Sequence, residues 1–275
     1  MSDWIELNRT NWDERAVPHA RSSDYGVERF VTDPDFLSHV VRYDLPRLGD
    51  LRGLRGVHLQ CHIGTDTLSL HRLGARMTGL DFSGPALAQA RDLAARTGAE
   101  IDYVQSELYA APAVLPPGGF DLVFTGIGAI CWLPDIRRWA EVVATLLRPG
   151  GRLFIREGHP VLWSLADPRP DALLALEYAY FETTEPVVFD EPGTYVSTDH
   201  AFQHTRSASW NHGLGEILTA LLDVGLQITA FEEHTSVPWD ALPGQMTLDE
   251  VTGEYRLTDR PERLPHSYTL QAVKA

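Results

Sequence analysis

The chain has 275 residues, of which 44% are hydrophobic and 22% are charged. This composition suffices for one large α/β domain with a full core. Its 38 acidic and 23 basic side chains leave a formal net charge of −15, which repels nucleic acid and anionic membrane surfaces unless a basic cluster opposes it. The sequence contains no such cluster, so we expect neither nucleic acid nor a membrane as a partner.

The N-terminal sequence and the cysteines predict a cytoplasmic protein. The start, Met1-Ser-Asp-Trp, lacks the basic and apolar regions of an export signal. The longest weakly polar run, residues 122–133, is shorter than the roughly 20 residues of a membrane-spanning helix. Cys61 and Cys131 lie far apart, which does not indicate a disulfide framework. The oligomeric state stays open.

Residues 1–50 are polar and aromatic, with helical patches around residues 12–16 and 35–43. The second patch follows Thr32-Asp-Pro, which is a typical helix start signal. We expect this segment to form an N-terminal helical lid.

From Gly56 onward, short apolar segments alternate with amphipathic ones, as in βαβ units around a parallel sheet. The predicted strands are residues 57–60, 76–81, 101–105, 120–124, 152–156, 226–232 and 267–273. The predicted helices are residues 66–73, 83–98, 135–147 and 214–222. The alternation breaks at about residues 158–211 and 235–266, which we interpret as cap insertions into one domain, residues 51–275. The predicted fold class is therefore α/β with a doubly wound, mostly parallel sheet.

In such a sheet, ligands bind outside the carboxyl ends of the strands. The first loop there, Gln60-Cys-His-Ile-Gly64, contains a glycine that would permit close approach of a ligand to the backbone. A complete G-x-G-x-x-G is missing, which disfavours a pyrophosphate and favours a ligand without phosphates, such as one with an amino-acid group.

Asp81 ends the second predicted strand, where a carboxylate can accept hydrogen bonds from both hydroxyls of a ribose. Its alternative role is to cap the helix that opens near Ser83. Glu107 follows the third strand at a position where it could meet an adenine edge, and its alternative is an exposed loop acid.

Six segments resemble a known family. They are Val57-His-Leu-Gln-Cys-His-Ile-Gly64, Gly79-Leu-Asp-Phe-Ser83, Gln105-Ser-Glu-Leu108, Phe120-Asp-Leu-Val-Phe124, Trp132-Leu-Pro-Asp135 and Leu147-Arg-Pro-Gly-Gly-Arg-Leu153. In this order they look like a class I S-adenosylmethionine-dependent methyltransferase, clearly over residues 51–156 and weakly through the last two strands. The family usually has an acidic residue and several glycines in the first loop, whereas this chain keeps only Gly64 of them.

The resemblance implies a seven-stranded sheet in the order 3-2-1-4-5-7-6 with an antiparallel last strand. It implies S-adenosylmethionine as cofactor and S-adenosylhomocysteine as product, with Asp81 on the ribose, Phe82 near the adenine and Gly126 on the methionine side. The residues that we expect to bind the cofactor are Tyr25, Gln60, Cys61, His62, Gly64, Asp81, Phe82, Ser106, Glu107, Leu108, Thr125 and Gly126.

Because a sulfonium methyl group is already activated, such an enzyme must mainly align the acceptor and exclude water. Oxygen and nitrogen acceptors also need a base for their proton. Glu157 and His159 at the end of the fifth strand, and His212 before the next helix, are the candidates for catalysis. For each of them, the alternative is a hydrogen-bonded structural side chain.

Other groups carry weaker signals. The spacing of Asp199, His200 and His204 would suit a metal on a helix, but the sequence around them favours strands and turns, so we expect no metal. Cys61 and Cys131 have no evident activating partner and are expected to be buried apolar side chains.

Aromatic residues are dense in the first insertion and in the N-terminal segment, and could line a pocket for a flat or apolar small molecule. They could also form the insertion's own core. These residues are Trp12, Tyr25, Tyr178, Tyr180, Phe181, Tyr195, Phe202 and Trp210.

The favoured function is transfer of a methyl group to an O, N or C atom of a small-molecule acceptor. Two alternatives stay open, a nicotinamide-dependent oxidoreductase and a member of the fold that binds the nucleoside without catalysis.

Overall fold

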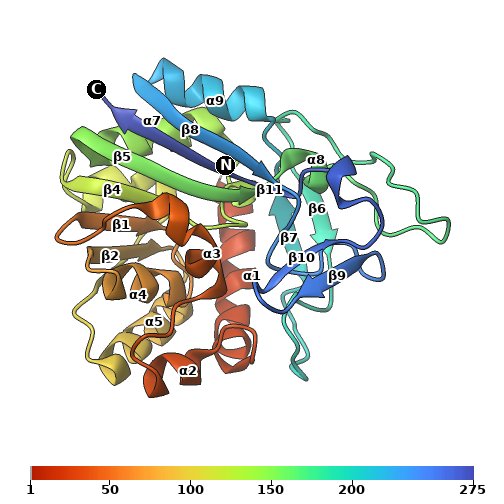
Figure 1. The fold of residues 1–275 in the computed structure, drawn as a ribbon, viewed down its shortest axis with the longest axis horizontal. Coiled ribbons are helices and arrows are strands. Elements are labelled where there is room, and N and C mark those ends of the chain that lie inside the picture. The colour runs from red at the N-terminus through yellow and green to blue at the C-terminus, as the bar shows by residue number, and fades with distance from the viewer. Residues whose placement is uncertain (1) are drawn as a thin grey trace.

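A central sheet of seven strands organises the computed structural model, which describes residues 2–275 (Figure 1). Its order is β3-β2-β1-β4-β5-β11-β8, where β11 is antiparallel to both of its neighbours and the pairs among β1 to β5 are parallel. The strands are β1 (Arg55–Leu59), β2 (Arg76–Asp81), β3 (Asp102–Gln105), β4 (Phe120–Thr125), β5 (Leu147–Gly158), β8 (Leu226–His234) and β11 (Ser267–Lys274). Counted along the chain, this is the predicted 3-2-1-4-5-7-6, so the fold class is confirmed.

Helices cover both faces of the sheet. They are α4 (Thr65–Arg72), α5 (Gly84–Thr97), α7 (Ile136–Leu146) and α9 (Leu214–Asp223), with the short α6 (Ala111–Val114) and the 3-10 turns η1 (Leu108–Ala110) and η2 (Ile130–Trp132) between them. One apolar core joins α7 and α9 to the sheet, and a second core on the opposite face joins α3 (His39–Leu48) and α4 to it.

Local signals account for these boundaries. The Ser83 hydroxyl accepts a hydrogen bond from the Ala86 N–H at the start of α5, and Gly98 ends the helix in the left-handed conformation. The Asp135 carboxylate accepts from two N–H groups at the start of α7. Both helices therefore begin and end where the sequence predicts.

The first 50 residues are helical, as predicted, but form three helices, namely α1 (Ser2–Arg21), α2 (Val27–Thr32) and α3. The predicted patch at residues 35–43 is helical only from His39, because the Ser38 hydroxyl caps the helix there by accepting from the Val41 N–H. In Figure 1, α1 lies between the sheet and the two insertions.

Both insertions lie together beyond one end of the sheet (Figure 1). The first contains α8 (Pro160–Trp163) and the hairpin of β6 (Val187–Asp190) with β7 (Arg206–Ser209). The second contains the hairpin of β9 (Met246–Asp249) with β10 (Glu254–Leu257) and the turn η3 (Pro261–Arg263). Trp163 of one insertion stacks on Trp239 of the other, with ring centroids 5.5 Å apart, so the two insertions share a small core.

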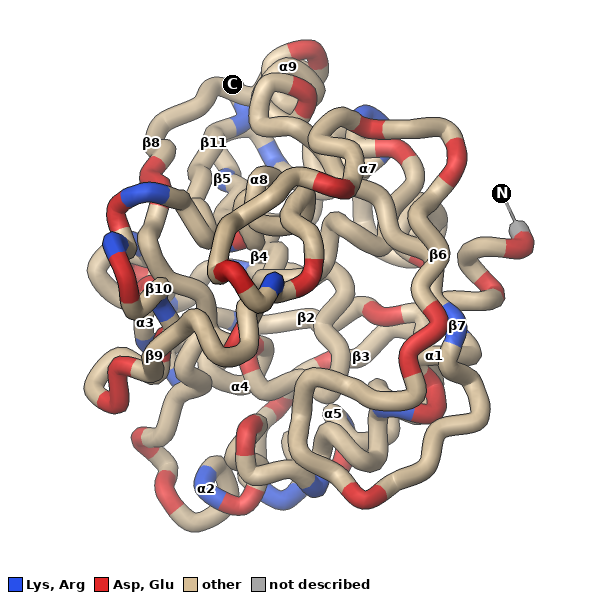
Figure 2. The backbone as a smooth tube through the Cα atoms, turned by 90° about the vertical axis from the view of Figure 1, so that its right-hand side faces the viewer, with Lys and Arg blue, Asp and Glu red and all other residues tan. Residues whose placement is uncertain are grey.

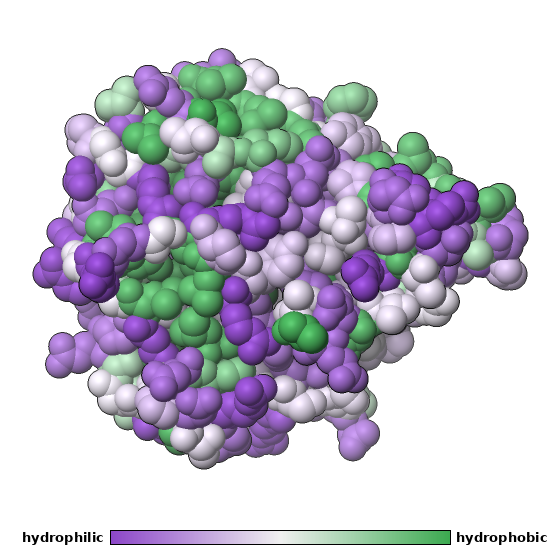
Figure 3. All heavy atoms as spheres, viewed as in Figure 1, coloured by the Kyte–Doolittle hydropathy of each residue, from purple (hydrophilic) through white to green (hydrophobic). Residues whose placement is uncertain are grey.

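The surface agrees with the acidic composition. Figure 2 shows Lys and Arg scattered singly or in small groups, and outnumbered by Asp and Glu. Figure 3 shows apolar atoms interrupting the hydrophilic surface, and Leu173, Leu176 and Phe181 of the first insertion are exposed. None of the helices described in residues 2–275 has the length and apolarity that a membrane span requires.

Candidate functional site

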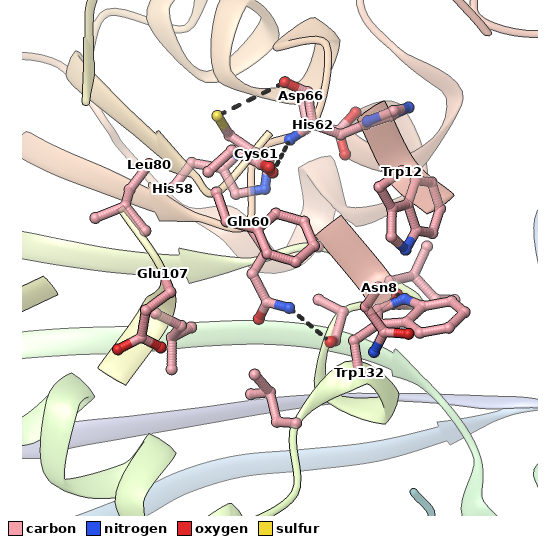
Figure 4. A pocket seen from close by; sticks show the side chains of 18 of the residues that line it. Asn8, Trp12, His58, Gln60, Cys61, His62, Asp66, Leu80, Glu107 and Trp132 are labelled. Atoms are coloured by element: carbon pink, nitrogen blue, oxygen red, sulfur yellow. Dashed lines mark hydrogen bonds between the residues drawn. The ribbon is translucent and has the colours of Figure 1, made fainter. Parts of the chain in front are cut away.

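A cavity of about 1060 Å³, including the space at its mouth, opens at the carboxyl ends of β1, β2 and β4. The loops after β1, β2, β3 and β4 all contribute to its lining, and α1 and the first insertion close it from outside. Figure 4 shows Leu80 and Glu107 on one side and Asn8, Trp12 and Trp132 on the other, with Gln60 between them.

Asp81 lines this cavity at the end of β2 and is only 5% exposed. Its two carboxylate oxygens accept hydrogen bonds from the backbone N–H groups of Ser83 (2.9 Å) and His62 (2.8 Å). Burial raises the pKa of Asp81 to about 6 despite these bonds. The carboxylate thus ties the loop after β1 to the loop after β2. Ser83, not Asp81, is the cap residue of α5.

The loop after β1 holds two non-glycine residues in the left-handed region, Gln60 at φ 56° and His62 at φ 49°. This conformation costs an ordinary residue roughly 1–2 kcal/mol. Both side chains line the cavity. The Gln60 amide donates to the Ala129 carbonyl over 2.9 Å, while its Oε1 is buried without a partner among the described residues. An unpaired acceptor therefore lies at the cavity wall, where a ligand's N–H or O–H could satisfy it.

The structure shows a packing reason for a glycine at residue 64. Its φ is +79°, and a Cβ added there would lie 2.6 Å from the Tyr103 hydroxyl and 2.8 Å from the Ala90 Cβ. The missing side chain therefore lets the loop pack against α5 and β3, and Gly64 is not part of the cavity lining.

Of the other residues expected to bind the cofactor, all except Thr125 line the cavity. Those that line the cavity are Tyr25, Cys61, His62, Phe82, Ser106, Glu107, Leu108 and Gly126. Glu107 is more than an exposed acid, because its carboxylate also accepts from the Tyr109 N–H over 2.9 Å. Thr125 lies behind the lining, fully buried, and its hydroxyl has no partner among the described residues.

Five rings from three distant segments pack together above the cavity, and we name them the roof cluster. Its members are Trp12, His19, Tyr25, His62 and Tyr195.

The roof cluster is hydrogen-bonded within itself and to the first insertion. Nδ1 of His19 lies 3.0 Å from Nε2 of His62, and Nε2 of His19 lies 2.7 Å from the Thr194 hydroxyl. The hydroxyls of Tyr25 and Tyr195 bond to each other. Burial lowers the pKa of His19 to about 2 and that of His62 to about 4, so both rings are uncharged at neutral pH.

The structure gives the three catalytic candidates other hydrogen-bond partners, and none of them is in the cavity lining. Glu157 accepts from four backbone N–H groups, those of residues 128, 129, 130 and 158. His159 caps α8 through its Nδ1, and its Nε2 lies 2.9 Å from Glu233. His212 donates from Nε2 to the carbonyls of Ile130, the first residue of η2, and Leu133, the residue after it. A direct catalytic role for them stays an untested prediction, and this geometry favours their structural alternative.

The remaining sequence predictions concern a metal site and the two cysteines. Within the described part of the chain, no three His, Cys, Asp or Glu side chains are grouped so that they could hold a metal. His200 instead lies 3.2 Å from Glu14 of α1. Cys61 and Cys131 are both free and buried, and burial raises the pKa of both thiols.

Charge is one-sided at the cavity. Three carboxylates line it, those of Asp66, Asp81 and Glu107, whereas no Lys or Arg occurs in the lining as far as the structure describes the chain. Because an anion buried there would have no opposite charge beside it, the cavity suits a neutral or cationic ligand.

Comparison with known proteins gives a consistent result. Residues 57–151 match the model of a family described as "Methyltransferase domain". The chain is 35% identical over 112 residues to a ubiquinone biosynthesis O-methyltransferase from Cronobacter sakazakii, covering 41% of this chain and 45% of the relative. A protein of the same name from Aeromonas salmonicida is 36% identical over 109 residues, covering 39% and 44%. The chain thus spans less than half the length of these curated relatives.

Solved structures extend the likeness over most of the chain. An S-adenosylmethionine-dependent methyltransferase from Mesorhizobium loti aligns with a TM-score of 0.58 and 25% identity, covering 84% of this chain and 98% of that one. A geranyl diphosphate C-methyltransferase from Streptomyces coelicolor, bound to S-adenosylhomocysteine, aligns at 0.52 with 14% identity, covering 85% and 78%, and supports the fold alone. Sequence match, strand order and the cavity at the expected edge agree: residues 57–151 are similar to a methyltransferase domain, and most of the chain shares the fold of the S-adenosylmethionine-dependent methyltransferase from Mesorhizobium loti.

Proposed function

We propose that this protein transfers the methyl group of S-adenosylmethionine to a small-molecule acceptor with a flat or apolar body. The observation that carries the proposal is the cavity itself. It combines a buried carboxylate at the end of β2 with an aromatic wall contributed by α1, η2 and the first insertion.

The residues at the cavity fit the cofactor. Asp81 would accept hydrogen bonds from the ribose hydroxyls through its remaining lone pairs, and Phe82 and Glu107 would frame the adenine. The unpaired Oε1 of Gln60 would accept from the methionine ammonium group. When bound, the cofactor supplies a methyl group that its sulfonium already activates.

The acceptor side of the cavity is aromatic and uncharged. Trp12 packs edge-on against Trp132, with ring centroids 5.3 Å apart, and Leu133 and Tyr195 extend this wall. Such a surface binds flat apolar molecules and excludes water from the reacting atoms. The curated relatives are named O-methyltransferases, which supports a hydroxyl oxygen as the atom methylated. We place the reaction in the cytoplasm, where free cysteines persist.

The two alternative functions make different demands on the cavity. A nicotinamide dinucleotide would bring a pyrophosphate to a wall with three carboxylates and without Lys or Arg among its described residues, so this geometry disfavours an oxidoreductase. A binding protein without catalysis would need the cofactor site but no space for an acceptor, and the aromatic wall argues against it.

Isothermal titration with S-adenosylhomocysteine, with NAD as control ligand, tests the proposal. We expect micromolar or tighter binding of S-adenosylhomocysteine and no binding of NAD. The variant Asp81→Asn should bind more weakly, whereas the matched control Asp92→Asn, on the exposed face of α5, should bind like the wild type. Binding of NAD without binding of S-adenosylhomocysteine would refute the methyltransferase proposal.

A further inference from the structure

The first loop carries a histidine where its own backbone favours glycine. His62 lies at φ 49°, a conformation that a glycine would adopt without strain. The neighbouring Gly64 is needed for packing, but no backbone reason requires an imidazole at residue 62. A side chain kept in a strained conformation at a cavity wall indicates a chemical role.

The surroundings of His62 provide a path for a proton. Its Nε2 lies 3.0 Å from Nδ1 of His19, and Nε2 of His19 lies 2.7 Å from the hydroxyl of Thr194. His19 is completely buried, whereas Thr194 is partly exposed on the first insertion. Each of the three groups can both donate and accept a hydrogen bond. The chain of bonds therefore leads from the cavity to the solvent side.

One pair of tautomers leaves the other nitrogen of His62 free to accept a proton. With both rings protonated at Nε2, His62 donates to His19 and His19 donates to Thr194. Nδ1 of His62 is then an acceptor, and it has no hydrogen-bond partner among the described residues. The ring lines the cavity beside the aromatic wall, with its centroid 5.2 Å from that of Trp12.

The carboxylates at the cavity are less suited to receive the acceptor's proton. Both oxygens of Asp81 accept backbone N–H groups, and Glu107 caps η1 on the side opposite to Trp12 (Figure 4). Asp66 faces Gly126, since its Oδ2 lies 3.4 Å from where a Cβ of that glycine would be. His62, unlike these carboxylates, packs directly against Trp12 of the wall where the acceptor would bind.

We propose that His62 is a catalytic base, and that His19 and Thr194 relay the acceptor's proton to solvent. This inference rests on the proposed methyl transfer to a hydroxyl. An oxygen lone pair forms the new O–C bond while the C–S bond breaks and its electron pair stays on sulfur. The hydroxyl proton goes to Nδ1 of His62, the Nε2 proton of His62 goes to Nδ1 of His19, the Nε2 proton of His19 goes to Thr194, and the Thr194 proton goes to water.

A weak base suffices for this step. A hydroxyl oxygen becomes strongly acidic as it gains the methyl group, so the proton need not be removed in advance. Uncharged rings also suit a relay, because a ring that already held both protons could not accept another. The low pKa values of His19 and His62 are therefore compatible with the role.

The test uses β-naphthol, a flat apolar alcohol whose hydroxyl becomes much more acidic when it is excited by light. The probe is added to protein saturated with S-adenosylhomocysteine and is excited at wavelengths beyond the tryptophan band. Fluorescence anisotropy gives the bound fraction, and the ratio of naphtholate to naphthol emission shows whether a base in the cavity takes the proton. The readout requires neither turnover nor knowledge of the natural acceptor.

We expect naphtholate emission from the bound probe in the wild type. It should fall about tenfold in His62→Gln, whose amide cannot take up a proton, and less strongly in His19→Gln. The control His71→Gln, in the last turn of α4 and outside the lining, should match the wild type. The far-ultraviolet circular dichroism and S-adenosylhomocysteine affinity of each variant show whether it is folded.

The outcomes separate the inference from the proposed function. Equal naphtholate emission in the wild type and His62→Gln would overturn His62 as the base, as would its absence from the wild type. Wild-type emission in His19→Gln would overturn the relay. If S-adenosylhomocysteine binds but β-naphthol does not, the aromatic acceptor site and this inference fail together while the cofactor assignment survives. Failure of S-adenosylhomocysteine itself to bind would refute the proposed function.

Discussion

Replacing Gly64 by alanine should destabilise the fold without acting first on the ligand. The substitution places a side chain at φ +79°, which costs roughly 1–2 kcal/mol for an L-residue. The new Cβ would also lie 2.6 Å from the Tyr103 hydroxyl and 2.8 Å from the Ala90 Cβ. Overpacking of this kind costs roughly 1–3 kcal/mol. Together we expect the free energy of unfolding to fall by about 2–5 kcal/mol, measured by urea denaturation at constant m-value.

The steric part of this cost can be separated from the backbone part. The Tyr103 hydroxyl is buried without a partner among the described residues, so Tyr103→Phe alone should be neutral or stabilising. In the double variant Gly64→Ala/Tyr103→Phe, the clash with the hydroxyl is gone, whereas the backbone strain and the contact with Ala90 persist. The double variant should therefore regain part of the lost stability. A Gly64→Ala protein with unchanged stability but weakened S-adenosylhomocysteine binding would refute this reasoning and show that Gly64 faces the ligand.

Three further predictions concern buried carboxylates. Asp81→Ala should weaken binding of S-adenosylhomocysteine by about 1–3 kcal/mol in calorimetry, and unchanged affinity would exclude its ribose role. Glu157→Gln should lower the free energy of unfolding by roughly 1–3 kcal/mol, because an amide cannot accept all four N–H groups that the carboxylate accepts, and equal urea midpoints would contradict this. Asp44 has its pKa raised from 3.8 to about 6, chiefly by burial and against the attraction of Arg156. The folded protein therefore binds this proton more tightly than the unfolded chain, and wild-type stability should fall by up to about 3 kcal/mol as the pH rises from about 4 to 6. Asp44→Asn should lose the share of this decline that Asp44 causes, while the share of Asp81, whose pKa burial also raises to about 6, remains. Parallel pH profiles of the two proteins would show that Asp44 contributes no share.

The sheet was predictable because its signals are local. Most strands between residues 55 and 158 contain a short apolar run, and the helices between them have caps such as Ser83 and Asp135 that act within three residues. The order of the strands came from the family resemblance, which the pairing of β11 between β5 and β8 confirms. The helix boundary at residue 39 was missed because Ser38 is a better cap than the earlier Thr32-Asp-Pro signal.

The site was predictable only where it lies on the sheet edge. Asp81 and Glu107 end or follow strands, so their place is determined by the topology. His19 and Thr194 were not anticipated, because 175 residues separate two groups that hydrogen-bond over 2.7 Å. The candidates Glu157, His159 and His212 were reasonable from their strand-end and cap positions. Sequence could not show that neighbouring N–H, carboxylate and carbonyl groups already engage their polar atoms.

The strained loop after β1 links the sheet edge to the rest of the site. Glycines at these two positions would form the turn without backbone strain, but this part of the cavity lining would then lack polar side chains. Gln60 and His62 instead adopt the left-handed conformation. Their side chains form hydrogen bonds, Gln60 to Ala129 in the loop after β4 and His62 to His19 of α1. Since the bond between His62 and His19 joins the sheet edge to the N-terminal helix, removing the His62 side chain should loosen α1 as well as remove the proposed base. His62→Gly should therefore relieve backbone strain and yet accelerate proteolysis within α1. Unchanged cleavage there would show that the other contacts of the helix, its packing against α5 and β7 and its hydrogen bonds to the first insertion, hold it without His62.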